Sequence, residues 1–304
     1  MLIDNKMATA LGTALATILA FASAACAHGF VGDRFFPPTI ATDDPFAVDE
    51  LDLPSVTAFG DPASDGTPGM RETDWGFEFD KEIFPHFALG ISDDYVSQSG
   101  RGQSSNYGWD NIEISAKYQL WQNDPHEAIV SVGLVSDIGG TGSQDVADSV
   151  STLTPTFYFG KGFGDLPESV NFLRPLAFTG TLGQSFPISG DDSNQFQWGF
   201  AVEYSLPYLQ QNVKDIGLPA PFKDMIPLVE FAMATNENRD GGGLTTGTIN
   251  PGVLWETPYF ELGAEAVIPV NGHGGSNVGF ILQTWIFIDD LFPKVFGNPI
   301  FGKD

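Results

Sequence analysis

The sequence predicts an all-β fold: a closed antiparallel up-and-down transmembrane β-barrel of about twelve strands. Three observations predict this fold. Apolar and polar residues alternate with a period of two, the connections between these segments alternate between two kinds, and the N-terminus has the pattern of a secretory signal. We expect a signal peptide at residues 1–27, a periplasmic N-terminal segment at 28–52 and the outer-membrane barrel at 53–304.

The clearest alternation lies in residues 195–206. One face of this expected strand carries large apolar side chains such as Phe196 and Trp198, and the other carries small or polar ones such as Gln197 and Glu203. Successive side chains of a strand point to opposite faces. The same pattern recurs in residues 75–80, 112–120, 229–234 and 260–268. Each segment is therefore expected to be a strand with one apolar and one polar face.

The connections between the expected strands are of two kinds, which alternate along the chain. Those of the first kind are polar and glycine-rich, namely 97–108, 139–150, 187–194, 236–247 and 270–277. Those of the second kind contain proline or are longer, namely 84–86, 123–125, 161–174, 207–226 and 257–258. Outer-membrane barrels alternate external loops with periplasmic turns in this manner. A first strand at 53–60 makes the strand number even and places both termini in the periplasm.

The composition of the two faces favours a membrane barrel over a secreted soluble β-sandwich or barrel, which is the alternative fold. The polar faces are rich in Gly, Ala, Ser, Gln and Glu, and the chain contains 26 Phe. Aromatic residues suit the girdles at the two bilayer interfaces, and a closed barrel satisfies every backbone group in lipid. Residues 277–288 have apolar side chains on both faces, so the lipid-facing side of the last strand stays open.

The first residues predict export. An apolar run at 8–22 is followed by small residues at 25–27, where we expect cleavage near Ala27. Cleavage there would remove Cys26, the only cysteine. No later apolar stretch reaches the roughly 20 residues of a spanning helix. The expected location is therefore the cell outer membrane, with its lipid and the barrel-insertion machinery as partners.

The charge of the chain excludes one class of partner. With 39 acidic against 13 basic residues the formal net charge is -26. Such a chain repels the phosphate backbone, so no nucleic acid is expected to bind.

Several short segments point to a family. After the expected signal the chain reads GFVGDRFFPP at 29–38, DDP at 43–45 and DEL at 49–51, and near its end DDLFPK at 289–294 and GNPI at 297–300. These segments resemble the start and end of proteobacterial outer-membrane barrels of the MetA-pathway-of-phenol-degradation type, a transporter-like family. The resemblance implies a small outer-membrane channel, linked in some members to the uptake of aromatic compounds.

Charged residues on the polar faces are the candidate functional residues. They share one parity and are Glu78, Asp80, Glu113, Lys117, Glu203, Glu230, Glu261 and Glu265. We expect them to line an aqueous lumen and to bias it toward cations or neutral polar solutes. In the alternative, Glu203, Glu230 and Glu265 pair with Arg or Lys and fill the barrel. Phe35, Phe36 and Phe46 could also draw the N-terminal segment inside as a plug.

Together these features predict a channel or transporter for small solutes, aromatic or hydrophobic compounds among them. The alternatives are a non-transporting structural or adhesin-like barrel and a secreted soluble β protein. We expect that the protein is not an enzyme and binds no cofactor. A serine nucleophile needs a histidine within hydrogen-bonding distance, and none of the histidines at 28, 86, 126 and 273 lies on an expected strand beside a serine. We expect no metal either, although His28 and a free α-amine could together chelate Cu²⁺; an ordinary terminal residue is the alternative.

Overall fold

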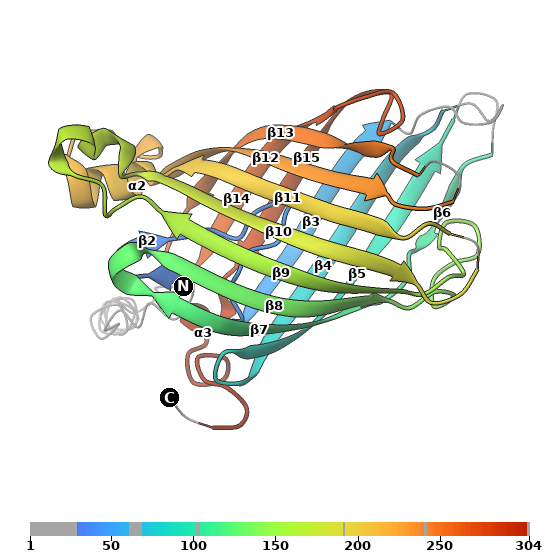
Figure 1. The fold of residues 1–304 in the computed structure, drawn as a ribbon, viewed down its shortest axis with the longest axis horizontal. Coiled ribbons are helices and arrows are strands. Elements are labelled where there is room, and N and C mark those ends of the chain that lie inside the picture. Colours follow the sequence, from blue (N-terminus) through green and yellow to red (C-terminus); the bar gives the residue numbers. More distant parts are fainter. Residues whose placement is uncertain (1–28, 61–68, 101–103, 191, 240–241, 303–304) are drawn as a thin grey trace, which may run out of the picture.

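The structure is a computed structural model that describes residues 29–60, 69–100, 104–190, 192–239 and 242–302. The expected signal peptide and His28 lie outside the described residues. The chain forms a barrel of long, tilted antiparallel strands with short helices at one end (Figure 1). The strands of the barrel are β3 (Glu50–Gly60), β4 (Arg71–Phe84), β5 (Phe87–Ser99), β6 (Asn106–Trp109), β7 (Glu113–Asn123), β8 (Ala128–Asp137), β9 (Thr152–Gly162), β10 (Leu176–Pro187), β11 (Gln195–Tyr204), β12 (Met225–Asn236), β13 (Thr245–Glu256), β14 (Phe260–Pro269) and β15 (Asn277–Ile286).

The barrel is closed and twelve strands wide, as predicted. The sheet contains 13 strands, but β6 and β7 pair with different parts of β5 and together fill one position in the wall. Each strand pairs with its neighbour in sequence, and the first strand, β3, pairs with the last, β15. Every barrel strand except the short β6 therefore has a partner strand on both sides, which closes the wall. The first strand begins at Glu50, before the expected boundary at Leu53.

The two faces of each strand are arranged as the alternation predicts. On β11, Phe196 and Val202 on the outer face are 37% and 40% exposed, whereas Glu203 on the inner face is 2% exposed. Other outward side chains are also large and apolar, for example Leu89, Ile114, Phe157, Leu182, Leu262 and Leu282. The apolar rows therefore cover the outside of the barrel. They are not packed against one another in a dry interior, as a soluble sandwich would require.

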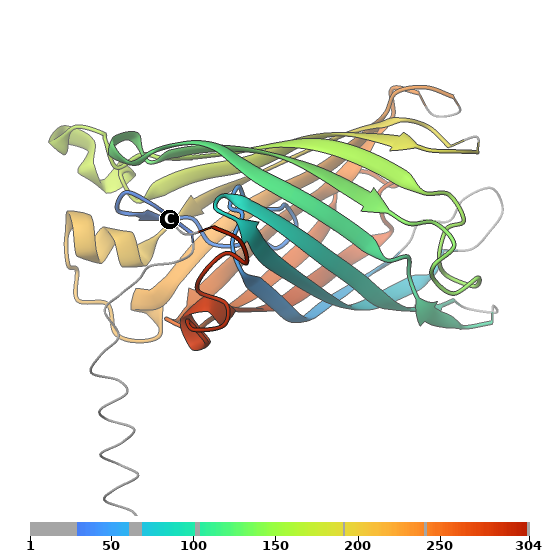
Figure 2. The same cartoon turned by 90° about the horizontal axis from the view of Figure 1, so that it is seen from below.

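The two ends of the barrel carry different connections (Figures 1 and 2). One end holds the tight turns at 85–86 and 257–259, both ends of the described chain, and the helical segments. These segments are η1 (Asp124–His126), η2 (Glu168–Leu173), α2 (Leu206–Tyr208), η3 (Leu209–Val213), η4 (Phe222–Asp224) and α3 (Ile288–Leu291). The other end holds the glycine-rich loops. We call these ends the plug end and the open end. No helix among the described residues is long and apolar enough to cross a membrane.

The residues before the first strand lie inside the barrel at the plug end. They include a small hairpin of β1 (Phe30–Val31) and β2 (Arg34–Phe35). Phe35, Phe36 and Phe46 are all buried, so the plug expected from these aromatic residues is present. We call residues 29–49 the plug.

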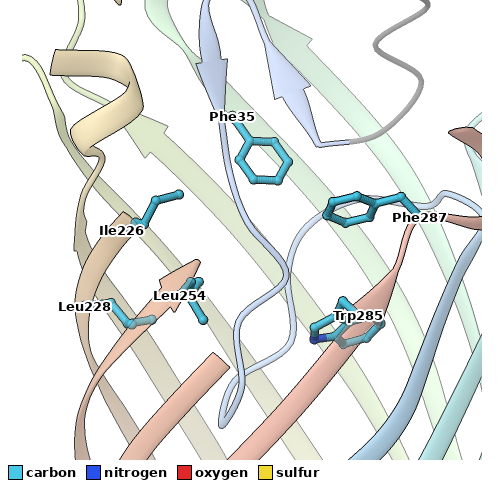
Figure 3. Packing of buried hydrophobic residues seen from close by; sticks show 6 residues of the cluster. All are labelled: Phe35, Ile226, Leu228, Leu254, Trp285 and Phe287. Carbon is cyan, nitrogen blue, oxygen red and sulfur yellow. The ribbon is translucent and has the colours of Figure 1, made fainter. Parts of the chain in front are cut away.

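The plug explains why the last strand has apolar residues on both faces. Trp285 on the inner face is 7% exposed and belongs to a buried cluster with Phe35, whereas Phe280 and Leu282 on the outer face are 46% and 48% exposed. Figure 3 shows Trp285 and Phe287 beside Phe35 of the plug. One apolar face of β15 thus lies on the outside of the barrel, and the other contacts the plug.

The chain does not end on its last strand. After α3 it returns to the plug end of β4, where the amides of Ile300 and Phe301 donate to the carbonyls of Glu82 and Ile83 at 3.2 and 2.9 Å. The Phe301 ring packs against Phe84 with 5.5 Å between ring centroids. The last aromatic residue therefore lies on the turn that follows β4.

The orientation of the two faces can be tested on adjacent residues of β10. Leu182 points outward, and Thr181 lines the lumen. Leu182→Lys should lower the free energy of unfolding in lipid by about 2–4 kcal/mol, the cost of a lysine on the lipid face near mid-depth. Thr181→Lys should cost less than about 1 kcal/mol, since an ammonium tolerates an aqueous, acidic lumen. Urea unfolding in liposomes measures both, and equal costs would contradict the orientation.

Candidate functional site

The plug contacts the inner wall through two hydrophobic clusters. In the first, Phe35 packs with Ile226, Leu228, Leu254, Trp285 and Phe287 (Figure 3). In the second, plug residues Val31, Phe36 and Phe46 pack with Ile129 and Ala177 of the wall. Phe35 and Phe36 are neighbours in sequence but belong to different clusters, so the plug is wedged between two sides of the barrel.

Glycines in the wall make room for the plug. A Cβ on Gly199 would lie 2.4 Å from Cγ2 of Thr42, and a Cβ on Gly263 would lie 2.4 Å from Cδ1 of Ile40. Real Cβ atoms do not approach other heavy atoms so closely, so even alanine at either position would force a shift. The chain at 40–42 therefore lies directly against the backbone of β11 and β14.

Glu230 on β12 holds this part of the plug. Its carboxylate accepts hydrogen bonds from the backbone amides of Ile40, Ala41 and Thr42 at 2.7, 3.0 and 2.7 Å. The hydroxyl of Thr42 donates to it at 2.8 Å. Hydrogen bonds to a charged group are stronger than neutral ones. Four donors on one fully buried carboxylate make Glu230 the principal polar attachment of the plug.

Arg34 fastens the plug at the rim. Its guanidinium donates to Glu127 Oε2 at 3.2 Å, to the carbonyl of Pro175 at 3.0 Å and to the carbonyl of Arg174. It also lies 3.8 Å from the centroid of the Tyr208 ring, and the Tyr208 hydroxyl donates to Glu127 Oε1 at 2.7 Å. Burial, together with the neighbouring Glu127 carboxylate, raises the pKa of Tyr208. The phenol therefore keeps its proton and remains a donor. We call Arg34, Glu127 and Tyr208 the rim clasp.

Two lysines of the wall pair with carboxylates of the plug. Lys117 Nζ lies 2.7 Å from Asp43 Oδ1 and 3.0 Å from the carbonyl of Asp44. Lys81 forms an ion pair with Asp49. Burial raises the pKa of Asp44, and the nearby Lys117 ammonium offsets part of this rise, so that the pKa is about 7. Lys117, predicted as a lumen-lining residue, is thus occupied by the plug.

A cavity of about 460 Å³ lies between the plug and the open end. Its floor is formed by Ala41, Thr42 and Asp43 of the plug. Its walls include Glu78 and Glu113, hydroxyl and amide side chains, and the ring of Tyr158; the other polar wall residues are Thr154, Thr156, Thr181 and Gln197. We call this cavity the vestibule. It combines negative charge, many hydrogen-bonding groups and one aromatic ring.

The predicted inner-face residues fall into two groups. Glu78, Asp80 and Glu113 lie on the wall formed by β4 and β7; Glu78 and Glu113 face the vestibule, and Asp80 lies over Gly90 of β5. Glu203, Glu230, Glu261 and Glu265 lie on β11, β12 and β14 and are at most 4% exposed. All eight predicted residues face the interior. The four glutamates do not line an open lumen, because they are buried in a barrel interior that the plug fills at this end.

The alternative in which wall glutamates pair with Arg or Lys to fill the barrel is wrong in its chemistry. The lumen is filled, but by residues 29–49, and Glu230 binds backbone amides. Within the described part of the chain, the carboxylate oxygens of Glu203, Glu261 and Glu265 have no partner at hydrogen-bonding geometry. No group of three or more acidic, histidine or cysteine side chains in that part could hold a metal ion.

Sequence reasoning missed the rim clasp. Its three members are separated by more than 80 residues in sequence, and two of them lie in connections between strands. A signal was nevertheless present, because Arg34 is a lone cation between Asp33 and the apolar pair Phe35 and Phe36. An arginine next to residues that become buried must find acceptors inside the protein.

The attachment of the plug at Glu230 can be tested by amide hydrogen exchange. Glu230→Ala removes four acceptor contacts, so the amides of Ile40, Ala41 and Thr42 should exchange about 10- to 100-fold faster, which corresponds to roughly 1.5–3 kcal/mol of lost protection. Glu113→Ala, a vestibule carboxylate on the opposite wall, should leave their exchange unchanged. Unaltered exchange in Glu230→Ala would show that the plug is held elsewhere.

Comparisons with known proteins establish the fold. No protein-family model matches the sequence, and no curated protein matches it. The structure is similar to that of an outer-membrane channel from Pseudomonas putida F1, with a TM-score of 0.52 and 13% identity over 83% of this chain and 99% of that one. Weaker likenesses are the KdgM porin in complex with disordered oligogalacturonate (TM-score 0.44, 11% identity, 78% and 98% covered) and the NanC porin (TM-score 0.45, 11% identity, 77% and 98% covered). The chain therefore has the fold of an outer-membrane β-barrel, whereas membership of the phenol-degradation family stays a prediction.

Proposed function

We propose that this protein is an outer-membrane channel for small solutes and that its plug closes the lumen in the state described here. One observation carries the proposal. The barrel is closed and acidic inside, and its lumen is filled at one end by a separate segment of chain, not by side chains of the wall meeting one another. The plug is joined to the wall covalently only at the start of β3, so it can leave the lumen without breaking the hydrogen bonds between the wall strands.

The outer surface supports a location in the outer membrane. Large apolar side chains cover the outside of the strands, and aromatic residues gather near the open end, where Tyr95 contacts both Trp75 and Trp109. Such a surface suits acyl chains bounded by an aromatic girdle. The end with the plug, the tight turns and both ends of the described chain is then the periplasmic end, and the vestibule opens outward.

The charges of the interior support a preference for cations and neutral polar solutes over anions. Glu78 and Glu113 face the vestibule, and Lys117 is paired with Asp43 of the plug. Rings of carboxylates favour cations in channels. A solute that carries carboxylates would be repelled by Glu78 and Glu113 on the wall formed by β4 and β7.

The aromatic or hydrophobic solute suggested by the family resemblance has narrower support. Tyr158 and Val135 lie on the vestibule wall and offer one patch where a small ring could pack. Most of the remaining lining residues carry a hydroxyl, amide or carboxylate group, and others, such as Ala232 and Ala234, are small and apolar. We therefore propose small polar solutes first, with an aromatic ring as a tolerated part of them.

The second candidate function is a barrel that does not transport. The filled lumen favours it, because no solute passes while the plug is seated. The two functions differ in one property: a structural barrel never opens, whereas a channel conducts when the plug is displaced.

Planar-bilayer recording separates the candidates. The wild-type protein should show rare openings, and Glu230→Ala, which loosens the plug, should conduct for a larger fraction of the time. Reversal potentials in a KCl gradient should show cation preference near ~0.1 M salt. The preference should weaken at ~1 M, where the Debye length falls from about 10 Å to about 3 Å.

The vestibule carboxylates provide the matched control. Glu78→Gln with Glu113→Gln should reduce the cation preference and leave the open fraction unchanged. Heat-modifiable gel mobility confirms that each variant retains its barrel. Anion preference would overturn the selectivity proposal, and absence of current in every folded variant would favour the structural barrel.

A further inference from the structure

The inner wall behind the plug contains more hydrogen-bond acceptors than the plug satisfies. Glu203, Glu261 and Glu265 are 2%, 0% and 4% exposed. Their six carboxylate oxygens, and the amide oxygens of Asn250 and Gln283, have no hydrogen-bonding partner among the described residues. Buried polar groups in proteins are normally satisfied, and a buried carboxylate is costly unless it is paired. This wall therefore lacks donors and positive charge.

The spacing of the carboxylates shows what could supply the donors. Glu203, Leu228, Gly252 and Glu265 lie opposite one another on four consecutive strands. Glu203 and Glu265 are thus three strand spacings apart, roughly 14 Å along the wall, and Glu261 is four residues, roughly 13 Å, from Glu265 on β14. No three of them could hold one metal ion. An elongated molecule with several separated donors fits such an array.

The plug already shows which chemistry the wall accepts. At Glu230 it offers three consecutive amide N–H groups and a hydroxyl. It also brings one cation, the guanidinium of Arg34, which is bound at the rim by Glu127 and lies over the Tyr208 ring. The side chain of Glu265 lies over Gly252 of β13, two residues along that strand from Asn250, which is paired with Glu230 of β12. The plug thus occupies the wall as a donor-rich and partly cationic segment, but satisfies only one of the four carboxylates fully.

We infer that this wall is a binding site for an elongated organic cation with several N–H groups, a polyamine in chemical class, and that such a cation competes with the plug. The inference rests on the proposed channel function and names a solute class for it. Each ammonium group brings up to three donors and one positive charge, which are the two properties that Glu203, Glu261 and Glu265 lack.

Competition follows from the geometry. A cation that reaches from Glu203 on β11 to Glu265 on β14 would cross β12 beside Glu230, where the plug is bound, so the two cannot be fully bound together. A ligand that binds only the unplugged state stabilises that state in proportion to the logarithm of its concentration over its Kd. The solute would then promote opening of its own path through the barrel.

Exposure of a buried plug residue reports this competition without requiring current. Ala47 is 3% exposed and small, so Ala47→Cys places a thiol in the plug with little change in volume. The full chain, inserted in liposomes, is treated with a maleimide in the presence or absence of spermidine at constant ionic strength. The parent protein shows whether Cys26 contributes to labelling. Saturating spermidine should accelerate labelling of the introduced thiol about tenfold, whereas glutamate and sodium at equal ionic strength should not.

Variants of the wall decide whether the site is the one inferred. Glu203→Gln, Glu261→Gln and Glu265→Gln combined should abolish the acceleration by spermidine. Glu261→Gln alone should weaken it, and this single variant serves if the triple variant does not insert. Glu168→Gln with Glu237→Gln, two exposed carboxylates away from this wall, should leave the acceleration intact.

The outcomes separate this inference from the channel proposal. No acceleration by spermidine, or equal acceleration in the wall variants, would overturn the binding site, whatever the bilayer recordings show. Acceleration that depends on the wall glutamates, without current in any folded variant, would keep the binding site and remove the channel.

Discussion

The structure depends on one constraint: carboxylates on the inner wall of a closed barrel must find hydrogen-bond donors, cations or water. The ladder of backbone hydrogen bonds fixes the parity of each strand, so residues that alternate with lipid-facing side chains must point inward. Glu203, Glu230, Glu261 and Glu265 are placed there by the apolar residues beside them. Inside a narrow barrel these groups need water, cations or donors from another part of the chain. The plug meets this need at Glu230, where the chain turns so that three consecutive amides face one carboxylate.

The same segment also meets an opposite need. The inner wall at the plug end carries apolar side chains as well, with Ile226, Leu228 and Leu254 on one side and Ile129 on the other. An unfilled lumen would expose these side chains to water at a cost of about 25 cal/mol per Å² of apolar surface. Phe35 and Phe36 cover them from the middle of the lumen. Apolar and acidic side chains thus lie side by side on this part of the wall, since Leu228 is paired directly with Glu203. The plug meets the apolar ones with phenylalanine rings and meets Glu230 with backbone amides.

Most of the wall could be predicted from the sequence, because a barrel strand carries its own pattern. Twelve strands, the ends of the described chain on one side and the inward position of all eight charged residues followed from alternation and from loop type. The occupancy of the lumen could be suspected only from Phe35, Phe36 and Phe46, since a plug has no periodicity. The attachment at Glu230 could not be predicted, because its donors are backbone amides, which every residue except proline carries. The inward position of Trp285 could not be predicted either, since periodicity cannot tell which of the two apolar faces of residues 277–288 meets lipid.

The connectivity of the plug determines what its removal would disturb. Its hairpin pairs only with itself, and none of its residues belongs to the ladder between β3 and β15 that closes the barrel. Departure of the plug would therefore leave the backbone hydrogen bonds of the wall intact, while it breaks the rim clasp, the bonds to Glu230 and two apolar contacts. Separation of the apolar clusters costs free energy because it exposes their side chains to water. The hydrogen bonds and ion pairs of the plug, in contrast, can be replaced by those of a competing donor or cation. Displacement is consequently easiest where the plug meets the acidic wall, and the strongest competitor there is a solute with the same donors and a greater positive charge.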